Sequence, residues 1–182
     1  MGRRDISICT IGGTGHGKST LVHAILESLK PGAYDNYNRG VVSTSNYDFK
    51  TAAKKYRIHD IPATYVARSF CNSPRYYGAV LVVSSVEGVT PEVRKHVQLA
   101  RWFGIPTLVP FLNKCDLIDQ SSNLLQAKRE IRTLLYLNGY RVFDLPISHG
   151  SAIECLKHEN SGWEGIQSLL DTLDRTIFSP YA

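Results

Sequence analysis

The chain has 182 residues and a formal net charge of +5, and 43% of its residues are hydrophobic and 20% are charged. These values are ordinary for a soluble globular protein, and the length suits one domain. No apolar run reaches the roughly 20 residues of a membrane-spanning helix. The N-terminus also lacks the apolar core of a secretory signal. We therefore expect a cytoplasmic protein with no membrane partner.

The cysteines and the basic residues add two further exclusions. None of the four cysteines lies in a CxxC pair, so zinc and redox sites have no support and reduced thiols are expected. The Lys and Arg residues are scattered along the chain without interleaved aromatic residues. We therefore interpret them as solvated faces and expect no DNA partner.

Short β-rich runs alternate with helix-patterned segments along the chain. Two runs are continuously apolar, as in central parallel strands covered on both faces, and an alternating run lies close to its successor, as in an antiparallel hairpin at a sheet edge. The apolar runs are 78–86 and 105–113, and the hairpin pair is 41–49 and 54–60. Two further strands are expected at 5–11 and 141–147.

Helix signals lie between these strands. Residues 90–104 begin with Thr90 as a candidate N-cap and Pro91 at the first helical position, and they end at Gly104. Helical periodicity also predicts helices at 121–139 and 161–178. The alternation indicates a three-layer α/β domain with a mostly parallel six-stranded sheet and one antiparallel edge strand. We expect residues 1–182 to form this single domain.

A phosphate-binding loop follows the first strand and precedes an amphipathic helix. Gly12-x-x-x-x-Gly17-Lys18-Ser19 matches the P-loop pattern, in which backbone N–H groups form an anion-binding concavity. Lys18 is suited to the β- and γ-phosphates and the Ser19 hydroxyl to Mg²⁺. The predicted phosphate contacts are Gly13, Thr14, Gly15, His16, Gly17, Lys18, Ser19 and Thr20. This loop alone leaves adenine and guanine nucleotides open.

Asn113-Lys114-x-Asp116 favours guanine. It lies at the carboxyl end of the run 105–113, the edge of an open α/β sheet where ligands bind. A carboxylate at Asp116 accepts hydrogen bonds from the guanine N1–H and 2-amino group, whereas adenine offers neither donor there. Asn113 would support the base and Lys114 would cover its face. After the last predicted strand, Ser151-Ala152-Ile153 would direct backbone N–H groups toward the guanine O6.

With these three elements, the chain resembles the G domain of translational GTPases of the elongation factor Tu type. The stretches TIGGTGHGKSTL, GAVLVVSSVEGVTPEVRKHVQLARWFGIPTLVPFLNKCDLID and GSAI carry the resemblance, which spans residues 5–178. It implies a GTP- or GDP-binding domain with Mg²⁺, held by Ser19 and Asp60, and a link to translation. In that family two β-barrel domains follow the G domain, and the ribosomal role also requires them. A protein or ribosomal partner is therefore only a weak expectation for this chain.

Two segments depart from the family, and both sense the γ-phosphate there. In the first, Arg39-Gly40 resembles a retained pair, but the position of the family's metal-binding threonine is Val42. A slip of one or two residues would bring Ser43 or Thr44 to the site. The alternative is that both residues belong to an edge strand.

The second departure is Asp60-Ile61-Pro62-Ala63-Thr64-Tyr65-Val66, which is two residues shorter than the family's Asp-Cys-Pro-Gly-His-Ala-Asp-Tyr-Val. Ala63-Thr64 either replaces the Gly-His pair or follows its deletion, and we favour deletion because the later residues then stay in register. Both alignments lose the histidine that orients water. Among the candidates, only Thr64 would hold a water, with Lys18 as the other catalytic residue.

The sequence therefore predicts a guanine-nucleotide-binding protein whose GTP hydrolysis is slow or dependent on a partner. The alternative is a non-catalytic nucleotide-binding module that does not respond to the γ-phosphate. An ATP-using P-loop kinase fits poorly with Asn113 and Asp116. His59 is expected to point to the face opposite Asp60, since side chains alternate along a strand, and to be packed or surface-exposed instead of catalytic. The remaining histidines, at 23, 96, 149 and 158, are expected to be structural.

Overall fold

One sheet of six strands forms the centre of the described chain, in the order β2-β3-β1-β4-β5-β6. The computed structural model describes residues 5–30, 45–72, 75–118, 121–157 and 160–178. Only the β2–β3 pair is antiparallel, and the other pairs are parallel. The strands are β1 (Ile6–Gly12), β2 (Ser45–Lys50), β3 (Lys55–Asp60), β4 (Gly78–Ser84), β5 (Leu108–Asn113) and β6 (Ser148–His149).

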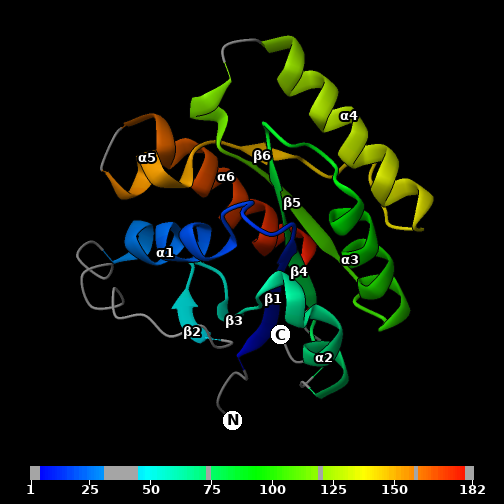
Figure 1. The fold of residues 1–182 in the computed structure, drawn as a ribbon. Helices are drawn as coiled ribbons and strands as arrows, with labels where there is room; N and C mark the ends of the chain where they lie inside the picture. The colour runs from blue at the N-terminus through cyan, green and yellow to red at the C-terminus, as the bar shows by residue number, and fades with distance from the viewer. Residues whose placement is uncertain (1–4, 31–44, 73–74, 119–120, 158–159, 179–182) are drawn as a thin grey trace.

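Helices cover both faces of the sheet, which confirms the predicted three-layer α/β fold (Figure 1). One face carries α1 (Lys18–Leu29), α5 (Ala152–Leu156) and α6 (Asn160–Thr176). The other carries α2 (Val66–Asn72), α3 (Pro91–Trp102) and α4 (Ser121–Leu137). Two short 3-10 helices, η2 (Ala63–Tyr65) and η3 (Cys115–Leu117), follow β3 and β5.

Strand pleating divides the core into two apolar layers. Along β4, Ala79, Leu81 and Val83 pack with the α2–α4 helices, while Val80 and Val82 pack with α1, α5 and α6. All seven residues of β4 and all six of β5 are buried. The continuous apolar runs of the sequence therefore correspond to central strands covered on both faces, as expected.

The prediction of a strand at 141–147 is wrong. These residues form turn and irregular structure, and only Ser148 and His149 pair with β5. Val142, Leu145 and Ile147 are buried in the apolar layer beside α4, so their spacing reflects packing of an irregular segment. Pro146 has no N–H to donate to a ladder, which further limits pairing before Ser148.

The other predicted elements are present with shifted ends. Strand β5 begins at Leu108 instead of 105, β4 ends at Ser84 instead of 86, and β2 runs to Lys50. The part of the predicted edge strand at 41–44 lies outside the described residues. Thr90 caps α3 as predicted, because its side chain accepts a hydrogen bond from the Val93 N–H at 3.3 Å.

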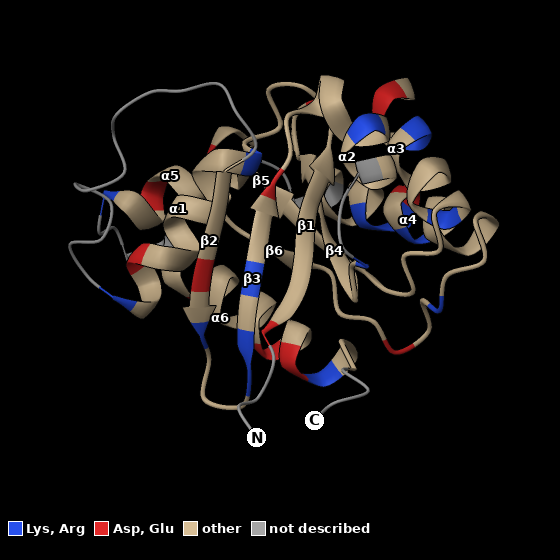
Figure 2. Ribbon diagram, turned by 90° about the horizontal axis from the view of Figure 1, so that it is seen from below, with Lys and Arg blue, Asp and Glu red and all other residues tan. Residues whose placement is uncertain are grey.

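Charged residues are spread over the described surface. Lys and Arg occur on several elements and are interspersed with Asp and Glu (Figure 2). No described helix combines the length and the apolar character needed to cross a membrane.

Candidate functional site

The carboxyl ends of four parallel strands meet at one edge of the sheet. β1 ends at Gly12, β3 at Asp60, β4 at Ser84 and β5 at Asn113. This is the edge at which open α/β sheets bind ligands. The fold therefore brings the predicted phosphate-loop, metal and base residues to one edge.

Lys18 lies within the phosphate loop, at the first position of α1. Its side chain is buried, and its ammonium donates to the carbonyl oxygens of Gly12 at 3.2 Å and Gly13 at 2.8 Å. Burial lowers the pKa of Lys18, while the charges of Asp60 and Glu92 oppose that shift. The Lys18 ammonium thus donates its hydrogen bonds to main-chain oxygens of the loop. An anionic ligand would take the place of these oxygens as acceptor.

Asn113 joins the phosphate loop to the residues that follow β6. Its buried side-chain amide donates to the His16 carbonyl at 3.0 Å, and its oxygen accepts from the Ala152 N–H at 3.0 Å. Gly17 has φ 87°, and a Cβ there would lie 2.3 Å from the Asn113 amide nitrogen. Only glycine therefore permits this close approach.

The segment after Asn113 turns sharply toward the surface. Lys114 has φ 62°, a left-handed conformation that is uncommon for a residue with a side chain and that recurs at functional sites. Its carbonyl accepts from the Ser85 hydroxyl at 2.7 Å, and its ammonium lies 3.6 Å from a Glu87 carboxylate oxygen. Asp116, within η3, is exposed, and its side chain forms no hydrogen bond with another described residue.

The structure refines the expectation for residues 151–153. The Ser151 side chain is buried and caps α5 by accepting from the Glu154 N–H at 3.3 Å. Because the Ala152 N–H is donated to Asn113, it is not free for a base. The N–H groups of Ser151 and Ile153, which precede the first intrahelical bonds, are the donors that this turn still offers.

Asp60 lies between two hydroxyl groups. Thr10 donates to one carboxylate oxygen at 2.9 Å and Ser19 donates to the other at 2.5 Å. Thr10 also accepts from the Ile61 N–H at 3.1 Å, which fixes the chain as it leaves β3. Oxygen donors of this kind suit Mg²⁺, which typically takes few protein ligands and keeps phosphate and water oxygens. The described residues contain no group of three or more His, Cys, Asp or Glu that could hold a metal ion by itself.

The remaining candidates divide into described and undescribed positions. Pro62 precedes η2, in which the Ala63 side chain is buried and Thr64 is exposed. The Thr64 side chain forms no hydrogen bond with any described residue. In the loop, Thr14 and Gly15 are exposed, Thr20 is partly exposed and Gly13 is buried. Val42, Ser43 and Thr44 lie outside the described residues, as do Arg39 and Gly40.

The profile of the family described as elongation factor Tu GTP binding domain matches residues 3–179. The chain belongs to this family. It is therefore a guanine-nucleotide-binding domain of the translational GTPase type, as the P-loop and Asn113-Lys114-x-Asp116 predicted.

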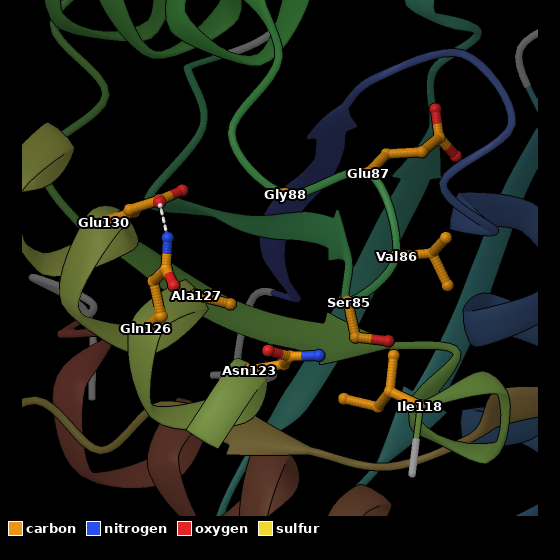
Figure 3. A pocket seen from close by; sticks show the side chains of 9 residues that line it. All are labelled: Ser85, Val86, Glu87, Gly88, Ile118, Asn123, Gln126, Ala127 and Glu130. Atoms are coloured by element: carbon orange, nitrogen blue, oxygen red, sulfur yellow. Dashed lines mark hydrogen bonds between the residues drawn. The ribbon is translucent and has the colours of Figure 1, made fainter. Parts of the chain in front are cut away.

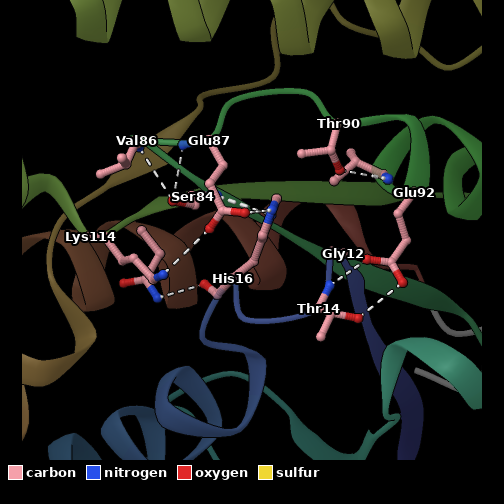
Figure 4. A network of polar contacts seen from close by, with 12 residues as sticks. Gly12, Thr14, His16, Ser84, Val86, Glu87, Thr90, Glu92 and Lys114 are labelled. Atoms are coloured by element: carbon pink, nitrogen blue, oxygen red, sulfur yellow. Dashed lines mark hydrogen bonds and ion pairs between the residues drawn. The ribbon is translucent and has the colours of Figure 1, made fainter.

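Beyond its sequence motifs, this G domain has a polar network that joins the phosphate loop to the segment 84–92 (Figure 4). His16 is buried, accepts from the Ser84 N–H at 3.2 Å and lies 3.6 Å from a Glu87 carboxylate oxygen. Burial lowers the pKa of His16, and the Glu87 charge opposes this shift. His16 thus fills the space beneath Gly13, where an added Cβ would lie 2.5 Å from its ring.

Two residues of α3 at this G domain's phosphate loop were not singled out as site residues by the sequence. Glu92 accepts from Thr14, and the buried His96 ring nitrogen lies 3.1 Å from the Gly12 carbonyl oxygen. An acidic residue in the first turn of a helix usually reflects the helix dipole, so Glu92 gave no distinct signal. His59 packs edge-on against Tyr76 with 9% exposure, which agrees with the expected structural role.

Neither of two sizeable pockets in the described chain is lined by a predicted site residue. A pocket of about 390 Å³ lies between the segment 85–88 and the start of α4, and Glu87 belongs both to it and to the polar network (Figure 3). A pocket of about 830 Å³ lies by the C-terminal ends of α4 and α6. The two pockets therefore do not coincide with the residues predicted to bind the nucleotide.

Proposed function

We propose that residues 1–182 form a single GTP-binding domain that binds GDP and GTP with Mg²⁺ and hydrolyses GTP slowly unless a partner completes the site. The observation that carries this proposal is the bonding of Asn113, which ties the phosphate loop to the turn at 151–153. A phosphate site and a base site held at a fixed separation are what a nucleotide requires.

The roles of the residues follow from their chemistry. Lys18 and the N–H groups of residues 13–20 would bind the phosphates, with the helix dipole of α1 adding to the attraction. Asp116 would accept the two guanine donors, and the Lys114 stem would cover one face of the base. The N–H groups of Ser151 and Ile153 would face the guanine O6, while Ala152 helps to position this turn through Asn113.

Ser19 and Asp60 fit a magnesium ion, since both present oxygen atoms that are already 2.5 Å apart. When bound, Mg²⁺ would neutralise charge on the phosphates. Thr10 would keep the Asp60 carboxylate oriented toward the loop.

Hydrolysis is where this G domain should differ from its relatives. Phosphoryl transfer depends on positioning of the attacking water and on electrostatic stabilisation. Lys18 supplies the latter, whereas the Gly-His pair that positions water is missing after Pro62. Thr64 is the remaining candidate on this segment, and its exposure supports a slow intrinsic reaction. A protein or ribosomal partner that orders this segment would accelerate it.

The runner-up function is a nucleotide-binding interaction module that does not respond to the γ-phosphate. The buried Ala63, which anchors η2 to the core, favours it because a packed segment moves less on nucleotide exchange. This module would bind GDP and a non-hydrolysable GTP analogue with equal affinity, and equal binding cannot shift a conformational equilibrium.

Isothermal titration of the nucleotide-free protein with GDP, GTP and ATP tests the binding proposal. GDP and GTP should bind in the presence of Mg²⁺ and ATP should not. If ATP binds as tightly as GDP, the guanine assignment is wrong.

Single-turnover hydrolysis of bound GTP tests the catalytic proposal. The wild-type rate should be slow, and Thr64→Ala should slow it further without changing GDP affinity. A partner-free rate equal to that of an activated GTPase would contradict impaired hydrolysis. No change in Thr64→Ala would remove Thr64 from the catalytic residues.

A further inference from the structure

The phosphate loop is already engaged by a carboxylate of the same chain. Glu92, at the second position of α3, accepts from the Thr14 N–H at 2.5 Å and from the Thr14 hydroxyl at 3.0 Å (Figure 4). Both oxygens of the carboxylate are therefore used on a single loop residue. Hydrogen bonding from the Thr14 backbone lowers the pKa of Glu92, so the side chain is an anion at neutral pH. A P-loop N–H is a donor for anions, and here the anion is internal.

The position of Thr14 in the loop decides which phosphate this contact concerns. Asn113 contacts His16 and approaches Gly17, so the base-binding residues lie at the end of the loop nearer α1. Thr14 lies at the opposite end, nearer β1, and Figure 4 shows Lys114 and Thr14 on opposite sides of His16. A nucleotide whose base is on Asp116 would run its phosphates along the loop toward Thr14. The terminal phosphate is the one that would reach Glu92.

The charge of Glu92 also acts on Lys18. Glu92 and Asp60 both favour the charged ammonium, so the carboxylate lies within the electrostatic reach of the lysine that is suited to the β- and γ-phosphates. A triphosphate must therefore either displace Glu92 from Thr14 or approach a negative charge. A diphosphate, which ends one phosphate earlier, avoids most of this cost.

We propose that Glu92 determines nucleotide specificity by competing with the terminal phosphate of GTP, so that the free domain favours GDP. This inference rests on the proposed function, because it assumes that guanine nucleotides occupy this loop. The role proposed for Glu92 is separate from the missing Gly-His pair. That pair would position the attacking water, whereas the Glu92 carboxylate would lie beside the terminal phosphate.

A neighbouring glutamate provides a matched control. Glu87 lies on the same 84–92 segment and also contacts the loop, but it reaches His16 and Lys114 and not Thr14. Replacing it removes the same charge from the base side of the network. Any effect on nucleotide affinity should therefore be shared by GDP and GTP.

The experiment is isothermal titration of wild type, Glu92→Gln and Glu87→Gln with GDP and with a non-hydrolysable GTP analogue, both with Mg²⁺. Glutamine keeps the size of the side chain and one oxygen that can accept from the Thr14 N–H, while its amide nitrogen can donate to the Thr14 hydroxyl, and it removes the charge. In Glu92→Gln the analogue should bind about tenfold more tightly, a change of about 1.4 kcal/mol, with GDP affinity nearly constant. In Glu87→Gln the ratio of the two affinities should equal that of wild type.

The remaining outcomes are decisive in the other direction. An unchanged affinity ratio in Glu92→Gln overturns the proposal, and so does an equal gain for both nucleotides, which would mean general competition with phosphate. Equal shifts of the ratio in both glutamine variants would reduce the effect to net charge and also overturn it. If wild type binds GDP but the ratio does not respond, only this inference fails. If wild type binds no guanine nucleotide, the proposed function fails with it.

Discussion

The proposed base side and the proposed terminal-phosphate side of this G domain lie at the same sheet edge but are held in opposite ways. On the base side, Asn113 uses both ends of its amide to join the phosphate loop to the turn at 151–153, and Asp116 is left exposed. On the terminal-phosphate side, Lys18 bonds to main-chain carbonyls, Thr14 bonds to Glu92, and Ser19 bonds to Asp60.

The two sides should therefore respond differently to a nucleotide: the base side is already arranged for binding, whereas the terminal-phosphate side must exchange internal contacts. The base-side contacts are compatible with a bound base and would persist, so little ordering cost would accompany base binding. On the other side, Lys18 and Thr14 use a cation and donors that phosphates would need, so their internal contacts would be exchanged on binding, whereas Ser19 and Asp60 would turn to Mg²⁺. Selectivity for guanine should therefore be a property of the free fold, whereas the response to the third phosphate should depend on how easily these internal partners are displaced.

The largest expected effect comes from removing the base-side carboxylate. Asp116→Ala leaves two guanine donors without acceptors, and losses of 1–3 kcal/mol for a buried unpaired group predict about 100-fold weaker GDP binding. The stability of the free protein should not change, because Asp116 is exposed and bonds to no described residue. Titration calorimetry measures the affinity, and Asp144→Ala, another exposed acid, is the control. An intact GDP affinity would place base recognition elsewhere.

The base side was also the more predictable of the two from sequence. Asn113, Lys114 and Asp116 lie within four positions at the end of an apolar strand, so the motif can be interpreted from the local sequence alone. The glycines and Lys18 of the phosphate loop are similarly local. The hydrogen bond between Asn113 and His16 could not be predicted from these local motifs, because a contact across 97 positions depends on tertiary structure.

The terminal-phosphate side depends on contacts that local patterns do not specify. Glu92 lies 78 positions from Thr14, and an acid after Thr90-Pro91 fits the start of a helix without further explanation. The wrong strand at 141–147 has a related cause. Val142, Leu145 and Ile147 are buried, but periodicity cannot distinguish a pleated strand from an irregular segment that packs against α4.

The second prediction breaks the link between the two sides. Asn113→Ala leaves the His16 carbonyl and the Ala152 N–H without their partner in a buried site, so we expect a loss of about 2 kcal/mol of stability and a Tm lower by about 4–8 °C. GDP affinity should fall as well, because the loop and the 151–153 turn are no longer held together. Thermal unfolding measures the first effect and calorimetry the second.

Asn138→Ala is the control, since Asn138 also donates to a main-chain carbonyl, that of Leu134 at 2.8 Å, but lies far from the loop in sequence and contacts. It should lower Tm by less and leave GDP affinity unchanged. A binding loss of equal size in both variants would show that general destabilisation, and not the Asn113 link, weakens the nucleotide.

A smaller effect should isolate the metal side. Thr10→Val preserves the shape of a fully buried side chain but removes the donor to Asp60 and the acceptor for Ile61. With Asp60 less firmly oriented, GDP affinity in Mg²⁺ should fall about fivefold, close to 1 kcal/mol, and should not change in excess chelator. Thr51→Val, at another buried threonine bonded to an aspartate, is the control. Equal losses with and without Mg²⁺ would mean that Thr10 shapes the loop and not the metal site.

The smallest effect concerns protonation behind Asp60. Burial lowers the pKa of His59, with Arg57 acting in the same direction and Asp48 opposing it, and its Nε2 has no hydrogen-bond partner among the described residues. The unfolded chain therefore takes up a proton near pH 6.5 that the folded chain resists. Stability from this residue is complete above about pH 6.5 and is lost as the pH falls toward the lower folded-state pKa.

Between pH 7.5 and 5.5, the unfolding free energy of His59→Phe in urea should fall by up to about 1 kcal/mol less than that of wild type. Tyr76→Phe keeps the ring against His59 and should retain the wild-type pH dependence. If His59→Phe and wild type lose equal stability on acidification, protonation of His59 does not contribute to the acid sensitivity of the fold.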